Sequence, residues 1–254
     1  MEERFFFRFT GLILMSIAFS HCGQKDSERA KHLAIADLNE SSSEFVFESD
    51  LPPPLTPPGP GAGPWNSESK TYDNIALAKA AKVFLKTTPA REKYGYETAE
   101  TFHHYFENTG TDFPVDLSKL LKAVPRVEKL YAAKVQRLMA TTQSLEAGTY
   151  KFTSRNSTET SIERSEDENW YLAVAGFSYW ISGTIVVDAD KKISASINYH
   201  LWDRYDWDPG VIIPIPTPFG VVDVDQERVG AFHRQGLAKE FSTVAKLTLN
   251  IPDA

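Results

Sequence analysis

Three carboxylates, one guanidinium and three aromatic rings lie within ten positions of the chain, residues 201–210. Asp203, Asp206 and Asp208 supply the carboxylates, and Arg204 supplies the cation beside them. Carboxylate oxygens are ligands that Ca²⁺ and Mg²⁺ prefer, so one interpretation is a divalent-cation site formed by the three aspartates. The spacing departs from the EF-hand pattern, because no glutamate follows at the closing position.

The same residues also offer the groups that general acid–base chemistry needs. Asp203 and Asp206 are three positions apart, and His233 and Arg234 follow later in the chain. If the chain folds back, His233 reaches one of the aspartates, and the pair can activate water for hydrolysis. A third interpretation is structural: Arg204 pairs with a nearby aspartate while the aromatic rings pack the end of the domain.

A β-strand is expected to position this cluster. Apolar and polar residues alternate strictly over residues 193–201, which predicts a half-buried antiparallel strand. Aromatic and β-branched residues predict further strands upstream, and the prolines at 214, 216 and 218 restrict the following stretch to an edge strand or a loop. The other expected elements are strands at residues 150–154, 170–187 and 246–251, and a short helix at 226–235.

Upstream of residue 148 the apolar residues follow a helical period instead. We expect a helix that begins near Tyr72, is capped by Asp73 or Asn74 and is stopped by Pro89. A second helix is expected over residues 98–108. Asp116 should cap a short helix, and Pro125 should open a long one. The fold class predicted is α+β, with a helical subdomain at residues 71–147 and an antiparallel sheet module at 148–254. A lysine stripe on the first helix, Lys79, Lys82 and Lys86, is interpreted as a solvated face.

Residues 22–70 are predicted to form a disordered Pro-rich tether. Seven prolines fall within residues 51–65, and proline lacks a backbone donor and fixes φ, which excludes a helix or a central strand there. The alternative interpretation is a Pro-rich ligand for the groove of a partner protein.

Residues 1–21 read as a secretory signal. Arg4 and Arg8 precede an apolar run over residues 9–19, and polar residues follow Cys22 directly. A bilayer-spanning helix needs roughly 20 apolar residues, so the run is too short to remain as a membrane anchor.

The end of this segment resembles a bacterial lipoprotein signal, with Phe19, Ser20, His21 and Cys22 at the matching positions. The resemblance implies that Cys22 carries a lipid, as an acyl or palmitate anchor, and that the mature protein is held at a membrane of the cell envelope. A cut after Ser20 is the alternative, and it would leave a secreted or periplasmic protein. Cys22 is the only cysteine, which favours lipid attachment over a structural disulfide.

The charge of the chain excludes one class of partner. With a net charge of −7 and a pI near 5.4, the protein lacks the excess of Lys and Arg that binding to nucleic-acid phosphates requires. The chain is long enough to bury one good core, and the remaining candidate partners are a membrane, reached through the lipid, and a protein or another envelope component.

Two family resemblances rest on the C-terminal part. Residues 200–210 and 230–241 resemble a module of uncharacterised activity in exported polymorphic-toxin proteins, some in Rhs contexts, which implies a secreted context. Asp203, Tyr205 and Asp206 also match the Asp-x-Tyr-Asp motif of colicin M, which cleaves a lipid-linked peptidoglycan precursor. The colicin M pattern continues with histidine and arginine, where this chain has Ile212 and Ile213, so His233 and Arg234 would have to substitute.

Two functions therefore compete, and the sequence leaves open whether the protein is an enzyme. The first is a lipid-anchored envelope or surface protein that acts as an interaction module through residues 203–210 and 228–234. The alternative is a toxin-like hydrolase that acts on envelope substrates with Asp203, Asp206 and His233.

Overall fold

The computed structural model describes residues 44–56, 59–210, 212–217 and 220–252. The predicted signal segment and Cys22 lie outside these residues, as does the first part of the predicted tether. Within the described residues, none of the helices combines the length and the apolar character needed to cross a membrane.

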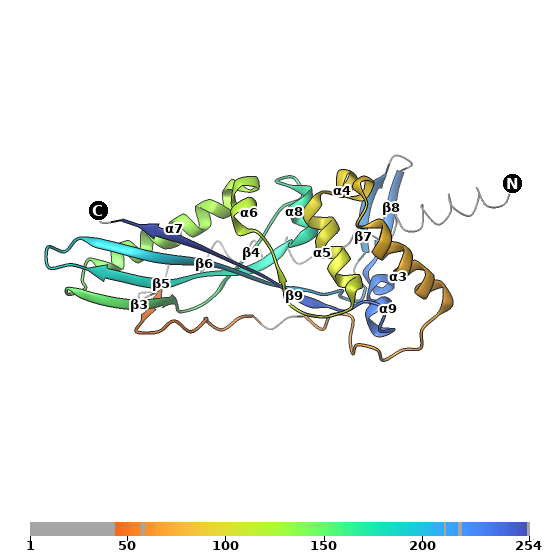
Figure 1. Ribbon diagram of the computed structural model, residues 1–254, viewed down its shortest axis with the longest axis horizontal. Helices are drawn as coiled ribbons and strands as arrows, with labels where there is room; N and C mark the ends of the chain where they lie inside the picture. The colour runs from red at the N-terminus through yellow and green to blue at the C-terminus, as the bar shows by residue number, and fades with distance from the viewer. Residues whose placement is uncertain (1–43, 57–58, 211, 218–219, 253–254) are drawn as a thin grey trace.

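A long, mostly antiparallel sheet of seven strands is the frame of the molecule (Figure 1). Its strand order is β1-β3-β5-β6-β9-β2, with β4 paired to β5 off this path, and β2 runs parallel to β9. The predicted strand with strict alternation is confirmed as β6, and its buried and exposed positions alternate as expected. The sheet strands are β1 (Phe45–Phe47), β2 (Phe113–Pro114), β3 (Gly148–Ser154), β4 (Thr158–Ser161), β5 (Gly176–Val187), β6 (Ile193–Tyr205) and β9 (Phe241–Ile251).

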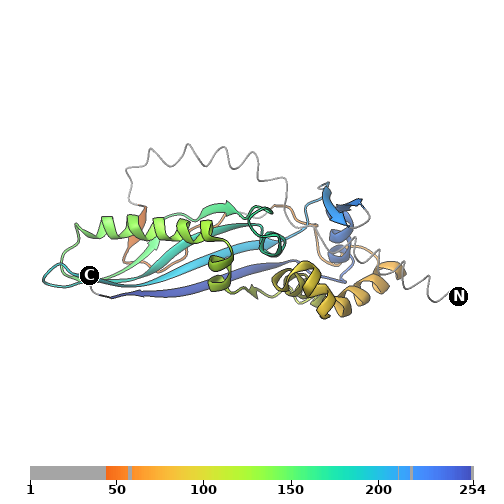
Figure 2. The ribbon, with the colours of Figure 1, turned by 90° about the horizontal axis from the view of Figure 1, so that it is seen from above.

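Helices cover one face of the sheet and gather at one end of it. The long helix α7 lies along the sheet (Figure 2), and its Tyr131 ring stacks on Tyr199 of β6 with centroids 4.5 Å apart. Asp116 caps α6 and Pro125 opens α7, as predicted. The helices are α3 (Tyr72–Phe84), α4 (Thr88–Tyr94), α5 (Tyr96–Glu107), α6 (Leu117–Ala123), α7 (Pro125–Thr142), α8 (Glu168–Ala173) and α9 (Gln226–Arg234).

Three local predictions differ from the structure. Thr71, rather than Asp73 or Asn74, caps α3, because its hydroxyl accepts the backbone N–H of Asn74. Pro89 is expected to stop the first helix, but α3 already ends at Phe84 and Pro89 lies in the first turn of α4. An N–H in the first turn has no partner within the helix, so a proline is tolerated there. The first residues of the predicted strand over residues 170–187 belong instead to helix α8. The carboxylate of Asp167 accepts the backbone N–H of Trp170 and so caps this helix.

The proline-rich stretch after β6 is an edge element, one of the two options predicted. Strand β7 (Ile212–Thr217) pairs with β8 (Gly220–Asp225) as a separate two-stranded sheet. Each strand of such a ribbon has a free edge, which leaves room for proline at alternate positions.

The helices and the sheet share one hydrophobic core, so the fold is α+β, as predicted. The second part of the predicted tether also contributes to it. Phe45 in β1 and Ala62 are almost completely buried, and β1 pairs with β3. From β1 the chain runs beside the sheet toward the end that carries α9 (Figure 1). This segment thus makes more contacts than the linker interpretation expects.

Candidate functional site

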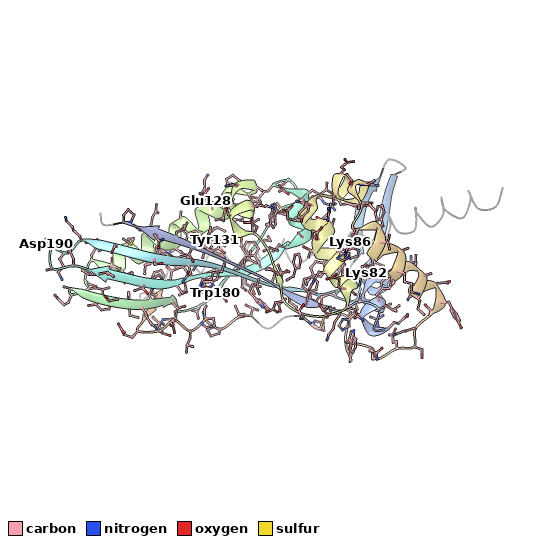
Figure 3. The ribbon with its side chains drawn as sticks, in the orientation of Figure 1. Lys82, Lys86, Glu128, Tyr131, Trp180 and Asp190 are labelled. Atoms are coloured by element: carbon pink, nitrogen blue, oxygen red, sulfur yellow. The ribbon has the colours of Figure 1, made fainter. Side chains whose placement is uncertain are left out.

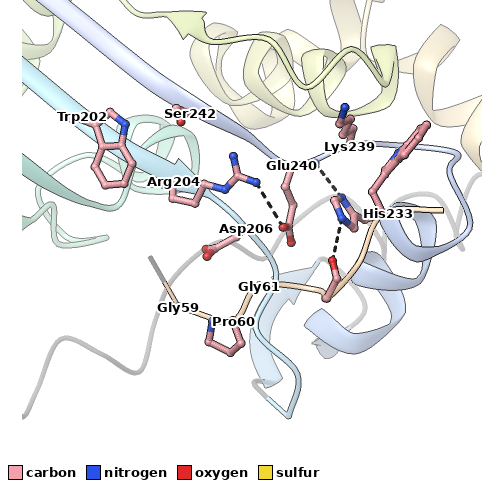
Figure 4. Close-up of a pocket in the computed structure, with 12 residues that line it drawn as sticks. Gly59, Pro60, Gly61, Trp202, Arg204, Asp206, His233, Lys239, Glu240 and Ser242 are labelled. Carbon is pink, nitrogen blue, oxygen red and sulfur yellow. Dashed lines mark hydrogen bonds and ion pairs between the residues drawn. The ribbon is translucent and has the colours of Figure 1, made fainter. Parts of the chain in front are cut away.

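A cavity of about 530 Å³ opens where β6 ends and β9 begins (Figure 4). Its walls come from segments far apart in the sequence: the end of β6, the connection from α9 to β9, and the Gly-rich stretch after the Pro-rich segment. The lining residues are Gly59, Pro60, Gly61, Gly63, Trp65, Trp202, Arg204, Asp206, His233, Lys239, Glu240 and Ser242.

The alternation of β6, continued to residue 206 just past the end of the strand, decides which residues of the sequence cluster line the cavity. Trp202, Arg204 and Asp206 line it, whereas Asp203 and Tyr205, at the intervening positions, do not. The opposing residue of β9 in the register, Ser242, lies across from Arg204 and lines the cavity too. The structure therefore separates Asp203 from Asp206, which the sequence had paired.

Tyr205 points into an aromatic cluster that anchors this end of the sheet. Its ring stacks on Phe241 at 4.8 Å and meets Trp207 and Tyr105 at 5.6 and 6.2 Å. Burial, with a smaller contribution from the Asp203 carboxylate, holds the pKa of Tyr205 well above its usual value. The hydroxyl therefore stays protonated, and the ring serves as support for the cavity wall.

Glu240 links the walls of the cavity, although no sequence pattern marks it. One carboxylate oxygen accepts the backbone N–H groups of Ala62 at 2.7 Å and Trp207 at 3.0 Å. The other oxygen lies 3.8 Å from the guanidinium of Arg204 (Figure 4). Burial raises the pKa of Glu240 and outweighs the opposing effects of the N–H donors and Arg204.

His233 lines the cavity with both ring nitrogens engaged by the backbone. Its Nδ1 accepts the N–H of Glu240 at 3.0 Å, so the proton of the neutral ring is on Nε2, which donates to the carbonyl of Gly63 at 3.1 Å (Figure 4). Burial, with smaller contributions from Arg204 and Lys239, lowers the pKa of His233. In this arrangement His233 is a neutral clamp between the Gly-rich segment and β9.

The remaining predicted residues hold the Gly-rich segment in place from outside the cavity. Arg234 donates to the carbonyl of Ala62 and pairs with Glu68 and Glu227. The carboxylate of Asp208 accepts the N–H of Gly61 at 3.2 Å. Arg234 therefore fastens residues 62–68 to α9, and Asp208 holds Gly61 from the segment that follows β6.

No metal centre is evident in the described part of the chain. Among those residues no group of three or more histidine, cysteine, aspartate or glutamate side chains is arranged to hold a metal ion. Of Asp203, Asp206 and Asp208, only Asp206 lines the cavity. The described geometry gives the predicted Ca²⁺ or Mg²⁺ site no support.

The interaction surface expected at residues 203–210 is buried at its centre, at residues 205–207. Tyr205 and Trp207 are 2 % and 1 % exposed, and Asp206 is 9 % exposed. From this stretch Arg204 and Asp206 line the cavity, a cation and a carboxylate. Lys239 and Glu240 line it from the connection directly before β9. The arrangement can hold an anionic group and present a carboxylate beside it.

Comparison with known proteins gives only distant similarities. No protein-family model matches the chain, and no curated protein matches it significantly. Three solved structures show weak similarity. PaeM, a colicin M-like bacteriocin produced by Pseudomonas aeruginosa, has a TM-score of 0.31 and 17% identity over 62% of this chain and 52% of its own. Truncated bacteriocin syringacin M from Pseudomonas syringae pv. tomato DC3000 has a TM-score of 0.28 and 14% identity over 70% and 82%. Pectocin M2 has a TM-score of 0.23 and 13% identity over 72% of this chain and 64% of its own.

The chain thus spans about half the length of PaeM. The resemblances of the C-terminal part to the colicin M motif and to the Rhs-context module remain predictions from the sequence.

Proposed function

We propose that this protein is a toxin-like hydrolase that acts on an anionic substrate of the bacterial cell envelope. One observation carries the proposal: a cavity lined by a cation, Arg204, near the end of β6, and by a carboxylate, Asp206, directly after the strand. Lys239 adds a second cation to the same lining. Paired cations suit a substrate that bears phosphate or carboxylate.

In the proposed reaction Arg204 holds the anionic group of the substrate and balances the charge that develops on it. Asp206 orients the attacking water and accepts its proton as the water oxygen bonds to phosphorus. The bond from phosphorus to the leaving oxygen then breaks, and the leaving oxygen takes the proton back from Asp206. Glu240 keeps Arg204 in place through the 3.8 Å ion pair, and His233 keeps the opposite wall closed through its bond to Gly63. His233 becomes a proton carrier only if Gly63 moves away and frees Nε2.

The envelope location is proposed from the N-terminal sequence. A lipid on Cys22 would hold the mature chain at a membrane, and a cut after Ser20 would release it into the periplasm or the medium. Intact-mass measurement of the N-terminus after export separates these outcomes. A lipidated Cys22 supports anchoring, and a chain that still begins at Met1 contradicts export.

The catalytic proposal is tested with Asp206→Asn in the full chain, exported to the periplasm of a test bacterium. Asparagine keeps the size of the side chain and removes its basicity. We expect the wild type to arrest growth and to release soluble phosphate-bearing fragments from washed envelopes, and Asp206→Asn to lose this release by about 100-fold or more.

Asp190→Asn is the matched control, because Asp190 is exposed in the turn between β5 and β6, at the opposite end of the sheet (Figure 3). This variant should act like the wild type. A wild-type chain with no effect on envelopes, or an Asp206→Asn variant that is equally active, contradicts the proposal.

A further inference from the structure

Positive charge is concentrated in one short stretch of an acidic chain. Residues 70–95, which include α3 and α4, contain six Lys or Arg against two Asp or Glu, a net charge of +4, while the whole chain carries −7. Such a separation of charge gives the molecule one face that attracts anions and a remainder that repels them.

The outer face of α3 combines this charge with exposed apolar groups. Tyr72, Lys79, Val83 and Lys86 follow one another at helical spacing on the same stripe, and Lys82 lies beside them. Val83 is 70% exposed and Tyr72 is 92% exposed. The opposite face of α3 packs on the protein body through Ala78, Ala81 and Leu85.

The lysines of this stripe are not neutralised by acidic neighbours. Lys79, Lys82 and Lys86 form no ion pair with another described residue, and Glu100 on the adjacent α5 is paired with Arg91. The positive charge of the stripe also acts on a buried group, His103. Burial is the largest cause that lowers the pKa of His103, and the charges of Lys86 and Lys82 lower it further, whereas Glu107 and Glu100 raise it.

The stripe lies at the cavity end of the molecule. The backbone N–H of Thr71, the cap of α3, donates to the side chain of Gln235 just after α9, and the N–H of Glu68 donates to the carbonyl of Arg234. Figure 3 shows Lys82 and Lys86 on α3, at the end that also carries α9. A surface bound by α3 would therefore lie at the same end as the cavity.

We infer that the outer face of α3 is a docking surface for a membrane with anionic lipids. Lysines near such a surface each add attraction to the negative headgroups, and an apolar side chain between them can enter the headgroup boundary. The exposed Val83 and Tyr72 favour a lipid surface over a soluble polyanion, because a soluble polyanion binds the charges but offers no apolar region for these side chains. This contact is independent of the lipid predicted at Cys22, and it would orient the cavity end toward the bilayer.

The test measures binding of the full chain to vesicles without any substrate, so its outcome does not depend on the proposed hydrolysis. Cys22→Ser in every sample removes the predicted lipid, and neutral phosphatidylcholine vesicles give the background from the apolar leader. The wild type should cosediment with phosphatidylglycerol-containing vesicles, more strongly at low salt than at high salt. Lys79→Gln/Lys82→Gln/Lys86→Gln should weaken this binding roughly 100-fold.

The matched control is Lys129→Gln/Lys192→Gln/Lys246→Gln, which removes the same charge from exposed positions on α7, the β5–β6 turn and β9. It should bind within about threefold of the wild type. Equal weakening by both triple variants, or equal binding of the wild type to neutral and anionic vesicles, overturns the inference.

Val83→Ser separates a bilayer from a soluble polyanion. It should weaken vesicle binding about tenfold, while binding to heparin stays unchanged. If Val83→Ser leaves vesicle binding intact and the three α3 lysines govern heparin binding instead, α3 binds polyanions and the membrane inference is wrong. Circular dichroism of each variant confirms that α3 still folds, since glutamine and lysine have similar helix propensity.

Discussion

Strand β6 passes through two regions that use the same kinds of residue differently, the middle of the sheet and the cavity end. In the middle, Tyr199 of β6 stacks on Tyr131 of α7. The hydroxyl of Tyr131 donates to the carbonyl of His200, the residue that follows Tyr199 in β6. At the cavity end, Tyr205 stacks on Phe241, but the groups around it are held by Ala62 and His233 from distant segments.

The difference lies in how many separate segments each region needs. The middle consists of α7 packed on paired strands, so neighbouring elements satisfy one another. The cavity end needs the Gly-rich segment, α9 and β9 to meet at Glu240, whose carboxylate is buried and accepts two backbone N–H groups. A region assembled in this way can hold charges close together, and it is also more easily damaged by a single substitution.

The largest effect on stability is expected from Trp207→Ala. The ring is 1 % exposed and meets Phe102, Tyr105 and Tyr205 within 6 Å, so its removal leaves a large void and should cost about 3–5 kcal/mol. Trp65→Ala removes the same side chain where it is 43% exposed, and should cost less than about 1 kcal/mol. Urea denaturation measures both values, and equal costs would show that the aromatic cluster does not anchor the cavity end.

Glu240→Ala tests whether the carboxylate joins the cavity walls. The backbone N–H groups of Ala62 and Trp207 would both lose their acceptor, which should cost about 2–4 kcal/mol. Glu240→Gln keeps one acceptor oxygen and should cost distinctly less. If both variants unfold at the same urea concentration as the wild type, the walls are held together without Glu240.

The same pair of variants carries a pH signature. Burial raises the pKa of Glu240 in the folded state above its unfolded value of about 4.5. The folded state therefore holds this proton more strongly, and the wild type should lose stability relative to Glu240→Gln as pH rises from 4.5 through the folded pKa.

A smaller effect of opposite sign is expected in the middle of the sheet, at His200. Its ring stacks on Trp180 at 4.8 Å, and burial, with a smaller contribution from Lys246, lowers its pKa to about 4. The unfolded chain binds a proton at His200 near pH 6.5, whereas the folded chain binds it only near pH 4. The contribution of His200 to the unfolding free energy is therefore fully present above pH 6.5 and is lost as the pH falls toward 4. The loss should reach about 2 kcal/mol, less than the full shift, since solvent screens part of it.

His200→Gln isolates this contribution. Glutamine can keep a hydrogen bond to Ser182, the partner of the ring at 2.8 Å, and does not titrate. The difference in unfolding free energy between wild type and variant should shrink or reverse between pH 7 and pH 4.5. A difference that is constant over this range would mean that His200 is not desolvated.

The two regions also differ in how far the sequence predicts them. The middle follows local rules: alternation over residues 193–201 places β6, Asp116 caps α6 and Pro125 opens α7. The cavity follows contacts between distant residues, such as the bond from Ala62 to Glu240 across 178 positions, for which no local pattern exists. The sequence indicates Asp206 and His233 because their side chains can do acid–base chemistry. It does not show where β6 ends, so it could not separate Asp203 from Asp206.

The smallest expected difference tests the closest approach in the cavity wall, at two glycines that are two positions apart in the sequence. Gly61 and Gly63 both have positive φ, +59° and +92°, so alanine at either position costs about 1 kcal/mol of backbone strain. Only at Gly61 would the added Cβ meet the carboxylate of Glu240, at 2.7 Å, whereas nothing lies within 4 Å at Gly63. Because two N–H groups fix that carboxylate, Gly61→Ala should cost about 1 kcal/mol more than Gly63→Ala. Equal losses by urea denaturation would mean that Glu240 moves freely, and the cavity end would then be no more tightly assembled than the rest of the sheet.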